Sequence, residues 1–351
     1  MKKFIFLFLF LCFSSLTAQV LYTENFDNYN LGNLGTDPTG VFPGKGGWLT
    51  SVSQTTPNNS YFTITNEQNK GKVLTVNTPV NTSLRVLRND LDSFIDQRSQ
   101  GYNVFKFEID YYTGEQYYTG NGNASPYVQL TLLFGQTYTP LFRYKHQLIS
   151  PTDDISAYYN EGILGVEKPI KLGNGIGGDS LPVNTWVTFI VYLDYTNKKI
   201  YFETPYFNKI VAGDFLSQST STNLIKDFKP RHIIFLSGSD NVKMVHKYDN
   251  IKITALNAVP PEVVNLSVNE KLATKFNLYP NPATSLVNIT NAENMQIQQI
   301  TVYDIAGKEI KKQTYTNENQ IQLNVENLSN GTYMLHLQTN EGLAVKKLVK
   351  K

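Results

Sequence analysis

The sequence predicts an all-β protein in which a large antiparallel sandwich of two sheets is followed by a smaller β-sandwich. Along most of the chain, short segments alternate apolar and polar side chains, as the two faces of a half-buried strand require. Clusters of Gly, Asn, Pro and Asp, which favour turns, separate these segments. Tyrosine and phenylalanine, both common in strands, account for 22 and 20 of the 351 residues.

Residues 1–18 have the pattern of a secretory signal peptide. A basic start precedes an apolar run over residues 4–13, and mostly small residues lead to a cleavage site after Ala18. The apolar run is too short to span a bilayer stably. Because Cys12 is the only cysteine of the chain, the mature protein is expected to contain no disulfide and no cysteine metal site.

The rest of the chain carries no excess charge. The whole sequence has 31 basic and 29 acidic residues. Without Lys2 and Lys3 of the leader, the numbers of basic and acidic residues are equal. A neutral mature chain gives no electrostatic indication of binding to nucleic acid or to a membrane surface. With 17% charged and 13% aromatic residues, the chain is also too apolar to be disordered.

Residues 19–257 are expected to form the large sandwich domain. Its clearest strand begins at Val104, where Phe105, Phe107 and Ile109 alternate with charged side chains. Further strands are expected at residues 127–134, 231–236 and 248–254, and in a hairpin of residues 186–195 and 199–203. A single helical turn is expected near residues 90–97. Many short strands in one unit favour a two-sheet antiparallel sandwich.

Three short segments give this domain a family resemblance. Glu24–Asp27, Asn184–Phe189 and Tyr248–Ile253 occur in that order, and their spacing resembles that of concanavalin-like and laminin-G-like jelly rolls. The resemblance implies that the first and last strands lie side by side. It also implies that the strand containing Trp186 lies in the middle of a sheet.

Two further parts of the chain follow. Residues 258–274 contain Pro260-Pro261 and little periodicity, so we expect an extended, semi-rigid linker. Residues 275–351 again alternate apolar and polar side chains, with turns at residues 306–308 and 329–331. This alternation predicts a small Ig-like β-sandwich.

The last part of the chain also carries a series of motifs. They are Phe276–Ala283, Ile300–Lys308, Leu328–Tyr333 and Lys346–Lys351. In this order they resemble the C-terminal sorting domain of proteins that the type IX secretion system of Bacteroidetes-type bacteria exports. The resemblance implies export through both membranes, recognition of residues 275–351 by the type IX machinery, and a secreted or surface-attached product from which the sorting domain is usually removed.

One segment suggests an enzyme. Glu108-Ile109-Asp110 resembles the strand of laminarinase-type glycosidases, which carry Glu-Ile-Asp and, two residues on, a second Glu. Retaining hydrolysis needs a carboxylic acid as proton donor as well as a carboxylate nucleophile. Here Thr113 stands at the acid position. Glu108 and Asp110 are therefore kept as an alternative catalytic pair, and the favoured interpretation is an ordinary polar strand face.

Asp249 suggests a metal site. It shares the alternation of Ile251 and Ile253, which predicts an interior position where a carboxylate needs a partner. The jelly-roll resemblance implies a structural Ca²⁺ between the first and last strands. Glu24 and Asp27 would then be the partners of Asp249, with backbone carbonyls and water completing the shell. The alternative is an Asp whose oxygens accept hydrogen bonds from backbone amides.

The tyrosine-rich centre suggests a ligand. Tyr117, Tyr118, Tyr158 and Tyr159 are expected in loops, where exposed rings can stack on sugars. The leading hypothesis is therefore a non-catalytic carbohydrate-binding or adhesion module. A laminarinase-type glycoside hydrolase and a structural surface component are the alternatives.

Overall fold

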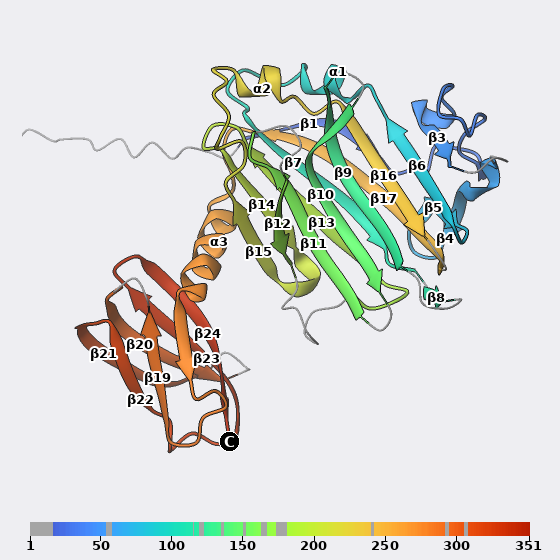
Figure 1. Ribbon diagram of the computed structural model, residues 1–351. Helices are drawn as coiled ribbons and strands as arrows, with labels where there is room; N and C mark the ends of the chain where they lie inside the picture. The colour runs from blue at the N-terminus through green and yellow to red at the C-terminus, as the bar shows by residue number, and fades with distance from the viewer. Residues whose placement is uncertain are drawn as a thin grey trace, which may run out of the picture.

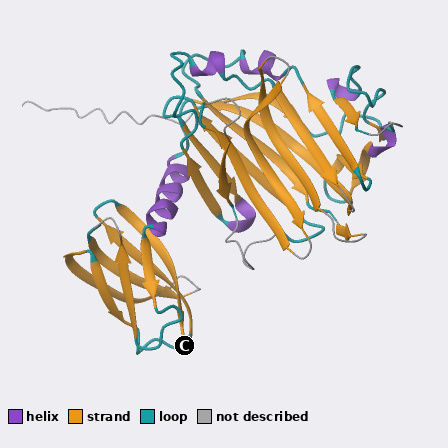
Figure 2. Ribbon diagram, viewed as in Figure 1, coloured by secondary structure: helices purple, strands orange, loops and turns teal. Residues whose placement is uncertain are grey.

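The computed structural model describes residues 17–53, 58–114, 116–118, 123–134, 137–149, 152–162, 167–172, 181–239, 242–291, 295–304 and 308–351. These residues form a large β-sandwich, a connecting helix and a small β-sandwich (Figure 1 and Figure 2). The predicted class, a large antiparallel sandwich followed by a smaller one, is confirmed.

The first domain contains a ten-stranded antiparallel sheet among the described residues. Its strands are β1 (Ala18–Glu24), β2 (Gly32–Asn33), β4 (Phe62–Glu67), β5 (Gly71–Thr78), β7 (Val104–Tyr112), β8 (Gln116–Tyr118), β13 (Trp186–Asp194), β14 (Lys199–Thr204), β15 (Lys209–Gly213) and β17 (Val242–Leu256). The order is β15-β14-β13-β7-β17-β5-β4-β2, with β1 and β8 also paired to β17. As predicted, the first strand β1 pairs with the last strand β17, and β13 lies inside the sheet.

A seven-stranded antiparallel sheet packs against it. Its strands are β3 (Leu49–Val52), β6 (Thr82–Arg88), β9 (Asn123–Phe134), β10 (Thr137–Ile149), β11 (Thr152–Asn160), β12 (Glu167–Lys171) and β16 (His232–Ser239). The order is β12-β11-β10-β9-β16-β6-β3. Aromatic pairs join the two sheets: Phe235 stacks on Tyr248 at 4.3 Å and Tyr144 on Phe189 at 4.2 Å between ring centroids. Such pairs add to the burial of apolar area that stabilises the core.

Short helices close the ends of the sandwich. They are α1 (Leu91–Ile95), α2 (Leu224–Asp227), η1 (Lys45–Gly47), η2 (Asn59–Tyr61) and η3 (Pro205–Phe207). The turn α1 falls within the predicted residues 90–97 and buries Leu91 and Ile95 in the core.

A β-bulge interrupts β17. Between Asp249 and Lys252, β17 has one residue more than its partner β7, and Asn250 there takes a φ of 50°. Asparagine tolerates this left-handed region better than most residues do. Because of the extra residue, Tyr248 and Ile251 both face the core. Asp249 instead lies opposite Asp110, on the face of the sheet that points away from the core. The prediction that Asp249 shares the interior face of Ile251 and Ile253 is therefore wrong.

The segment after β17 is helical, which corrects the predicted extended linker over residues 258–274. The helix α3 (Pro261–Thr274) begins with proline at its first position, where no N–H is needed and the fixed φ suits a helix. Val263, near its start, packs on the first domain, and Leu272, near its end, packs in the core of the second. The helix therefore contacts both domains (Figure 1).

The second domain is a sandwich of two small antiparallel sheets. One contains β18 (Phe276–Tyr279), β19 (Leu286–Asn291) and β22 (Gln320–Asn324); the other contains β20 (Ile297–Asp304), β21 (Glu309–Glu318), β23 (Gly331–Thr339) and β24 (Gly342–Lys350). Asn281 of the first motif ties it to the last strand, since its Nδ2 donates to the carbonyl of Lys347 at 2.9 Å and its Oδ1 accepts from the amide of Val349 at 2.8 Å.

Candidate functional site

The side chains of the ten-stranded sheet that point away from the core form a surface that we call the outer face. On β7 this face carries Lys106, Glu108, Asp110 and Tyr112, while the residues between them are buried in the core. Neighbouring strands add further rows to it, because antiparallel partners point to the same side. The predicted polar strand face is thus a continuous surface, and its two ends differ in chemistry.

At one end, which we call the open end, two aromatic rings meet. The rings of Tyr112 and Trp186 lie on adjacent strands, half-buried, with centroids 5.4 Å apart. The ammonium of Lys70 lies 4.7 Å from the centroid of Trp186, and that of Lys247 lies 4.8 Å from the centroid of Tyr112. The Tyr112 hydroxyl donates to Asn184 Oδ1 at 3.1 Å. Apolar ring surface and polar groups therefore occur together here.

The two candidate catalytic acids are already engaged by cations. Asp110 accepts hydrogen bonds from Asn250 Nδ2 at 2.8 Å, Lys70 Nζ at 2.6 Å and Thr188 Oγ1 at 2.7 Å. Burial disfavours its charged form, but these three donors outweigh burial and hold the pKa of Asp110 below its usual value. Glu108 forms an ion pair with Lys106 at 2.7 Å.

Asp249 is the cross-strand neighbour of Asp110 and lies on the same side of the sheet. It is only 1% exposed, and its Oδ1 has no hydrogen-bond partner among the residues that the structure describes. Burial raises the pKa of Asp249 to about 6; the Asn250 amide and Lys70 oppose the rise, while Asp110 and Asp27 add to it. Two adjacent carboxyl groups thus have pKa values shifted in opposite directions.

The three residues predicted to bind calcium do not converge. Glu24 accepts hydrogen bonds from the Phe26 amide, from Trp48 Nε1 and from the Tyr29 hydroxyl. Within the described ranges, no group of three or more His, Cys, Asp or Glu side chains is arranged to hold a metal ion. Calcium binding by these three residues stays a prediction.

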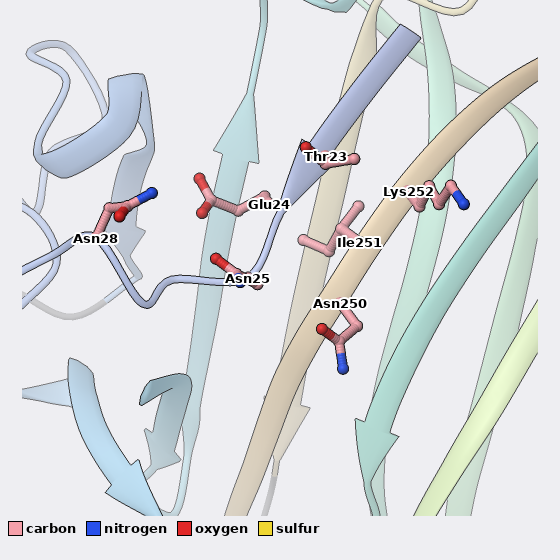
Figure 3. Close-up of a pocket in the computed structure, with 7 residues that line it drawn as sticks. All are labelled: Thr23, Glu24, Asn25, Asn28, Asn250, Ile251 and Lys252. Carbon is pink, nitrogen blue, oxygen red and sulfur yellow. The ribbon is translucent and has the colours of Figure 1, made fainter. Parts of the chain in front are cut away.

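A polar pocket of about 440 Å³ lies where β1 ends beside the bulge of β17 (Figure 3). It is lined by Thr23, Glu24, Asn25, Asn28, Asn250, Ile251 and Lys252. Asn250 connects this pocket to the open end, since its amide donates to Asp110. The pocket thus adjoins the row of polar side chains on the outer face.

The other end of the outer face, which we call the covered end, is apolar. Ile190, Tyr192, Tyr201 and Ile210 point outward there, and the segment Val259–Val264 packs on them. Val259 and Val263 are 8% and 3% exposed, so the start of α3 shields this end from solvent.

Acidic groups surround the covered contact. The Tyr192 hydroxyl donates to Glu203 Oε2 at 3.3 Å. Burial raises the pKa of Glu203 above its usual value; Tyr192 and Lys106 oppose the rise, and Glu108 and Glu262 add to it. The start of α3 thus brings a further carboxylate to this end of the face.

The four tyrosines predicted to bind a ligand belong to strands of two different sheets. Tyr117 and Tyr118 belong to β8, and their side chains lie outside what the structure describes. Tyr158 and Tyr159 lie in strand β11 of the other sheet, not in a loop. The ring of Tyr158 is half-buried, 4.7 Å from the Arg143 guanidinium.

Tyr159 is not one of the exposed tyrosines of this set. It is 8% exposed, and a Cβ added to Gly213 would lie 2.6 Å from its ring, so the ring packs on the backbone of β15. The four tyrosines were predicted to bind a ligand because they were expected in loops, and this criterion leaves out Tyr112 and Trp186, which lie in strands. Tyr112 could have been found, because it shares the alternation of Glu108 and Asp110.

Two histidines that are distant in sequence meet behind the open end. The Tyr111 hydroxyl lies 3.0 Å from His146 Nδ1 and 2.9 Å from His246 Nδ1, and all three side chains are buried. Burial, together with His146, lowers the pKa of His246 to about 3. This hydrogen-bonded network joins β7, β10 and β17 beneath the aromatic pair.

Comparison with known proteins identifies the second domain. Residues 277–351 match the model of the secretion system C-terminal sorting domain. A comparison with curated proteins finds no match. Among the described residues, no helix is long and apolar enough to cross a membrane.

Several solved structures are similar to part of the chain at low identity and low TM-score. A family 16 endo-glucanase from Bacteroides ovatus is 11% identical, with a TM-score of 0.40 over 66% of this chain and 99% of that one. Alginate lyase vAL-1 from Chlorella virus is 12% identical, with a TM-score of 0.38 over 60% and 95%. A winged bean acidic lectin is 10% identical, with a TM-score of 0.34 over 68% and 99%. None of these values assigns an activity. What the comparisons identify is the export signal: the type IX sorting domain at residues 277–351 directs this protein to the outside of the cell or to its surface.

Proposed function

We propose that the first domain is a non-catalytic carbohydrate-binding module, displayed outside the cell by the sorting domain. The observation that supports this is the Tyr112–Trp186 ring pair at the open end, 5.4 Å between centroids and surrounded by polar side chains. Sugar rings present apolar C–H faces and polar hydroxyl edges. An aromatic surface with hydrogen-bonding groups at its margin complements both.

On the same surface, the two candidate catalytic acids are both engaged by other side chains. Asp110 has a lowered pKa because three donors bind it, so it is ionised at neutral pH. Glu108 pairs with Lys106. A general acid must carry a proton when the glycosidic oxygen leaves, and an ionised Asp110 cannot supply it.

Glycan binding by the purified full-length protein tests the proposal. We expect binding on a glycan array that Trp186→Ala reduces by about fivefold or more, because a stacked ring contributes about 1 kcal/mol or more. Trp186→Phe should retain part of the affinity. Tyr206→Ala is the matched control, because Tyr206 is an aromatic residue of the same domain that is 49% exposed and lies outside the open end. Equal binding by Trp186→Ala and the wild type would contradict the proposal.

Glycoside hydrolysis is the second candidate, and one observation favours it. Asp110 and Asp249 are neighbours with pKa values shifted apart, which is the pattern of an acid and base pair. Against it, Asp249 is buried and no substrate oxygen can reach it without rearrangement. We expect laminarin and agarose to release no reducing ends. Sustained release that Glu108→Gln or Asp110→Asn abolishes would establish the hydrolase instead.

A further inference from the structure

The pocket beside the bulge contains two charged side chains, Glu24 and Lys252, and neither forms an ion pair within the part of the chain that the structure describes. Among the described residues, no carboxylate forms an ion pair with Lys252: Glu108, opposite it on β7, pairs with Lys106. Glu24 is engaged by three donors from its own loop and β3 region. Glu24 keeps its negative charge, but neutral donors occupy its oxygens, so the ammonium of Lys252 is the charged group of the pocket that remains available to a ligand.

The other free polar groups of the pocket are neutral. Asn250 uses its amide nitrogen on Asp110, which leaves its carbonyl oxygen as an acceptor. Asn28 and Thr23 are exposed at the pocket wall. Asn25 forms a hydrogen bond with the nearby Asp27, in which Asn25 Nδ2 donates to Asp27 Oδ2 at 3.0 Å. The pocket thus offers amide and hydroxyl groups together with one ammonium.

We propose that this pocket binds one residue of an anionic carbohydrate, whose carboxylate or sulfate pairs with Lys252 while its hydroxyls bond to Asn28, Asn250 and Thr23. This inference rests on the proposed carbohydrate-binding function and specifies its ligand. A pocket of about 440 Å³ is large enough for one sugar unit. The Lys252 side chain extends away from Asn28 in Figure 3, and its flexible stem lets the ammonium follow an anion in the pocket or at its rim.

The position of the pocket supports a single continuous ligand. Asn250 bridges the pocket to Asp110, and Asp110 contacts both Lys70 and Thr188, which lie beside Trp186 on the outer face. A chain of sugars stacked on the open end would therefore reach the pocket by crossing β17. An anionic group on that chain would meet the unpaired ammonium there.

Binding of the full-length protein to three oligosaccharides tests this inference. The probes are an oligogalacturonate, a sulfated galactan oligosaccharide and a neutral laminari-oligosaccharide, with affinities measured by calorimetry at low and at physiological salt. We expect at least one anionic probe to bind more tightly than the neutral one, and its affinity to fall as salt rises. The preferred anionic probe tells whether a carboxylate or a sulfate is recognised.

Two variants locate the effect at the pocket. Lys252→Gln should weaken binding of the preferred anionic probe about tenfold to a hundredfold, the range of a charge-assisted hydrogen bond. Asn28→Asp, which adds a carboxylate to the pocket wall, should weaken it as well. Lys243→Gln makes the same charge change at an exposed lysine of the same strand and should alter affinity by less than twofold.

The outcomes separate this inference from the proposed function. If Trp186→Ala weakens binding of every probe but Lys252→Gln does not, the carbohydrate-binding function stands and the anionic pocket is wrong. Equal effects of Lys252→Gln and Lys243→Gln, or tighter binding of the neutral probe, also overturn the pocket. If no probe and no arrayed glycan binds, both proposals fail.

Discussion

The open and covered ends of the outer face lie on the same strands, yet one is solvated and the other is packed. In β13, Trp186 and Thr188 face outward at the open end, among polar neighbours. Farther along the same strand, Ile190 and Tyr192 face outward and are buried beneath the start of α3. The strand geometry is the same at both ends, so the outward side chains decide which end needs a cover.

This difference separates binding chemistry from stabilising chemistry on one surface. The covered end buries apolar side chains against Val259 and Val263, which contributes to folding stability in proportion to the area removed from water. The open end keeps aromatic rings and paired charges accessible, and such pairs contribute little to stability. Substitutions at the covered end should therefore act on stability, and substitutions at the open end on binding.

The largest effect is expected from Val263→Asp in the full-length protein. It places a carboxylate in an apolar contact that already lies close to Glu203 and Glu262, so the free energy of unfolding of the first domain should fall by about 3 kcal/mol or more. Denaturant unfolding monitored by tryptophan fluorescence measures it.

A neighbouring variant provides the control for this change. Glu262→Gln removes one negative charge from the same helix turn, and it should leave stability unchanged or raise it slightly, because it relieves repulsion with Glu203. If Val263→Asp is as stable as Glu262→Gln, then α3 does not shield the outer face, and the comparison of the two ends fails.

Asp249→Asn should produce a smaller effect with the opposite sign. The folded-state pKa of Asp249 is about 6 and the ordinary value is 3.8, so the folded protein holds the proton more tightly. Stability is therefore lost as pH rises from 3.8 through 6, and the whole cost, at most about 3 kcal/mol, is present above that. An asparagine cannot ionise, so the variant does not lose this stability at high pH. The amide of the asparagine can also donate to Asp110.

The pH profile distinguishes this cause from a general packing effect. The wild type and Asp249→Asn should have similar melting temperatures near pH 4, and the variant should melt higher at pH 8. The contribution of His246 cancels, since its pKa is lowered in both proteins. Two results would contradict this cause: a variant that melts at a lower temperature than the wild type at pH 8, or a difference in melting temperature between the two proteins that is the same at both pH values. Either would show that ionisation of Asp249 does not destabilise the folded protein.

Several parts of this fold could be predicted from local patterns. Alternation located β7 and the hairpin of β13 and β14, and the jelly-roll resemblance implied the pairing of the first and last strands. The cover on the outer face also left a signal: Phe189 to Leu193 is apolar at every position, which indicates a strand buried on both faces. That signal does not say which segment provides the cover, because the contact joins β13 to residues about 70 positions later.

The remaining features depend on long-range packing or on single-residue irregularities. One extra residue in β17 reversed the predicted side of Asp249, and alternation alone cannot reveal a bulge. The helix α3 was obscured by Pro260-Pro261, which can end an extended segment or begin a helix equally well. The histidine pair around Tyr111 joins residues 35 and 135 positions away, which no local pattern records.

The smallest effect concerns the cation at the open end. Lys70 Nζ lies 2.6 Å from Asp110 and 4.7 Å from the Trp186 ring centroid, and its charge also lowers the cost of ionising Asp249. An ammonium of the chain itself thus lies among the carboxylates near the predicted calcium site. Lys70→Met keeps the stem over the ring and removes the charge, which should cost about 1 kcal/mol in a pair that is partly exposed.

Chelation of the wild-type protein completes this test of the open end. If Lys70 supplies the positive charge that Asp110 and Asp249 need, EGTA should change the melting temperature by less than about 2 °C, while Lys70→Met should lower it by about that amount. The reverse result, a large drop with EGTA that added calcium restores and no effect of Lys70→Met, would instead support the calcium ion predicted for Glu24, Asp27 and Asp249. Since an ion that binds only the folded state stabilises it by mass action, about 2.7 kcal/mol at a hundredfold excess over its dissociation constant, the two outcomes are well separated.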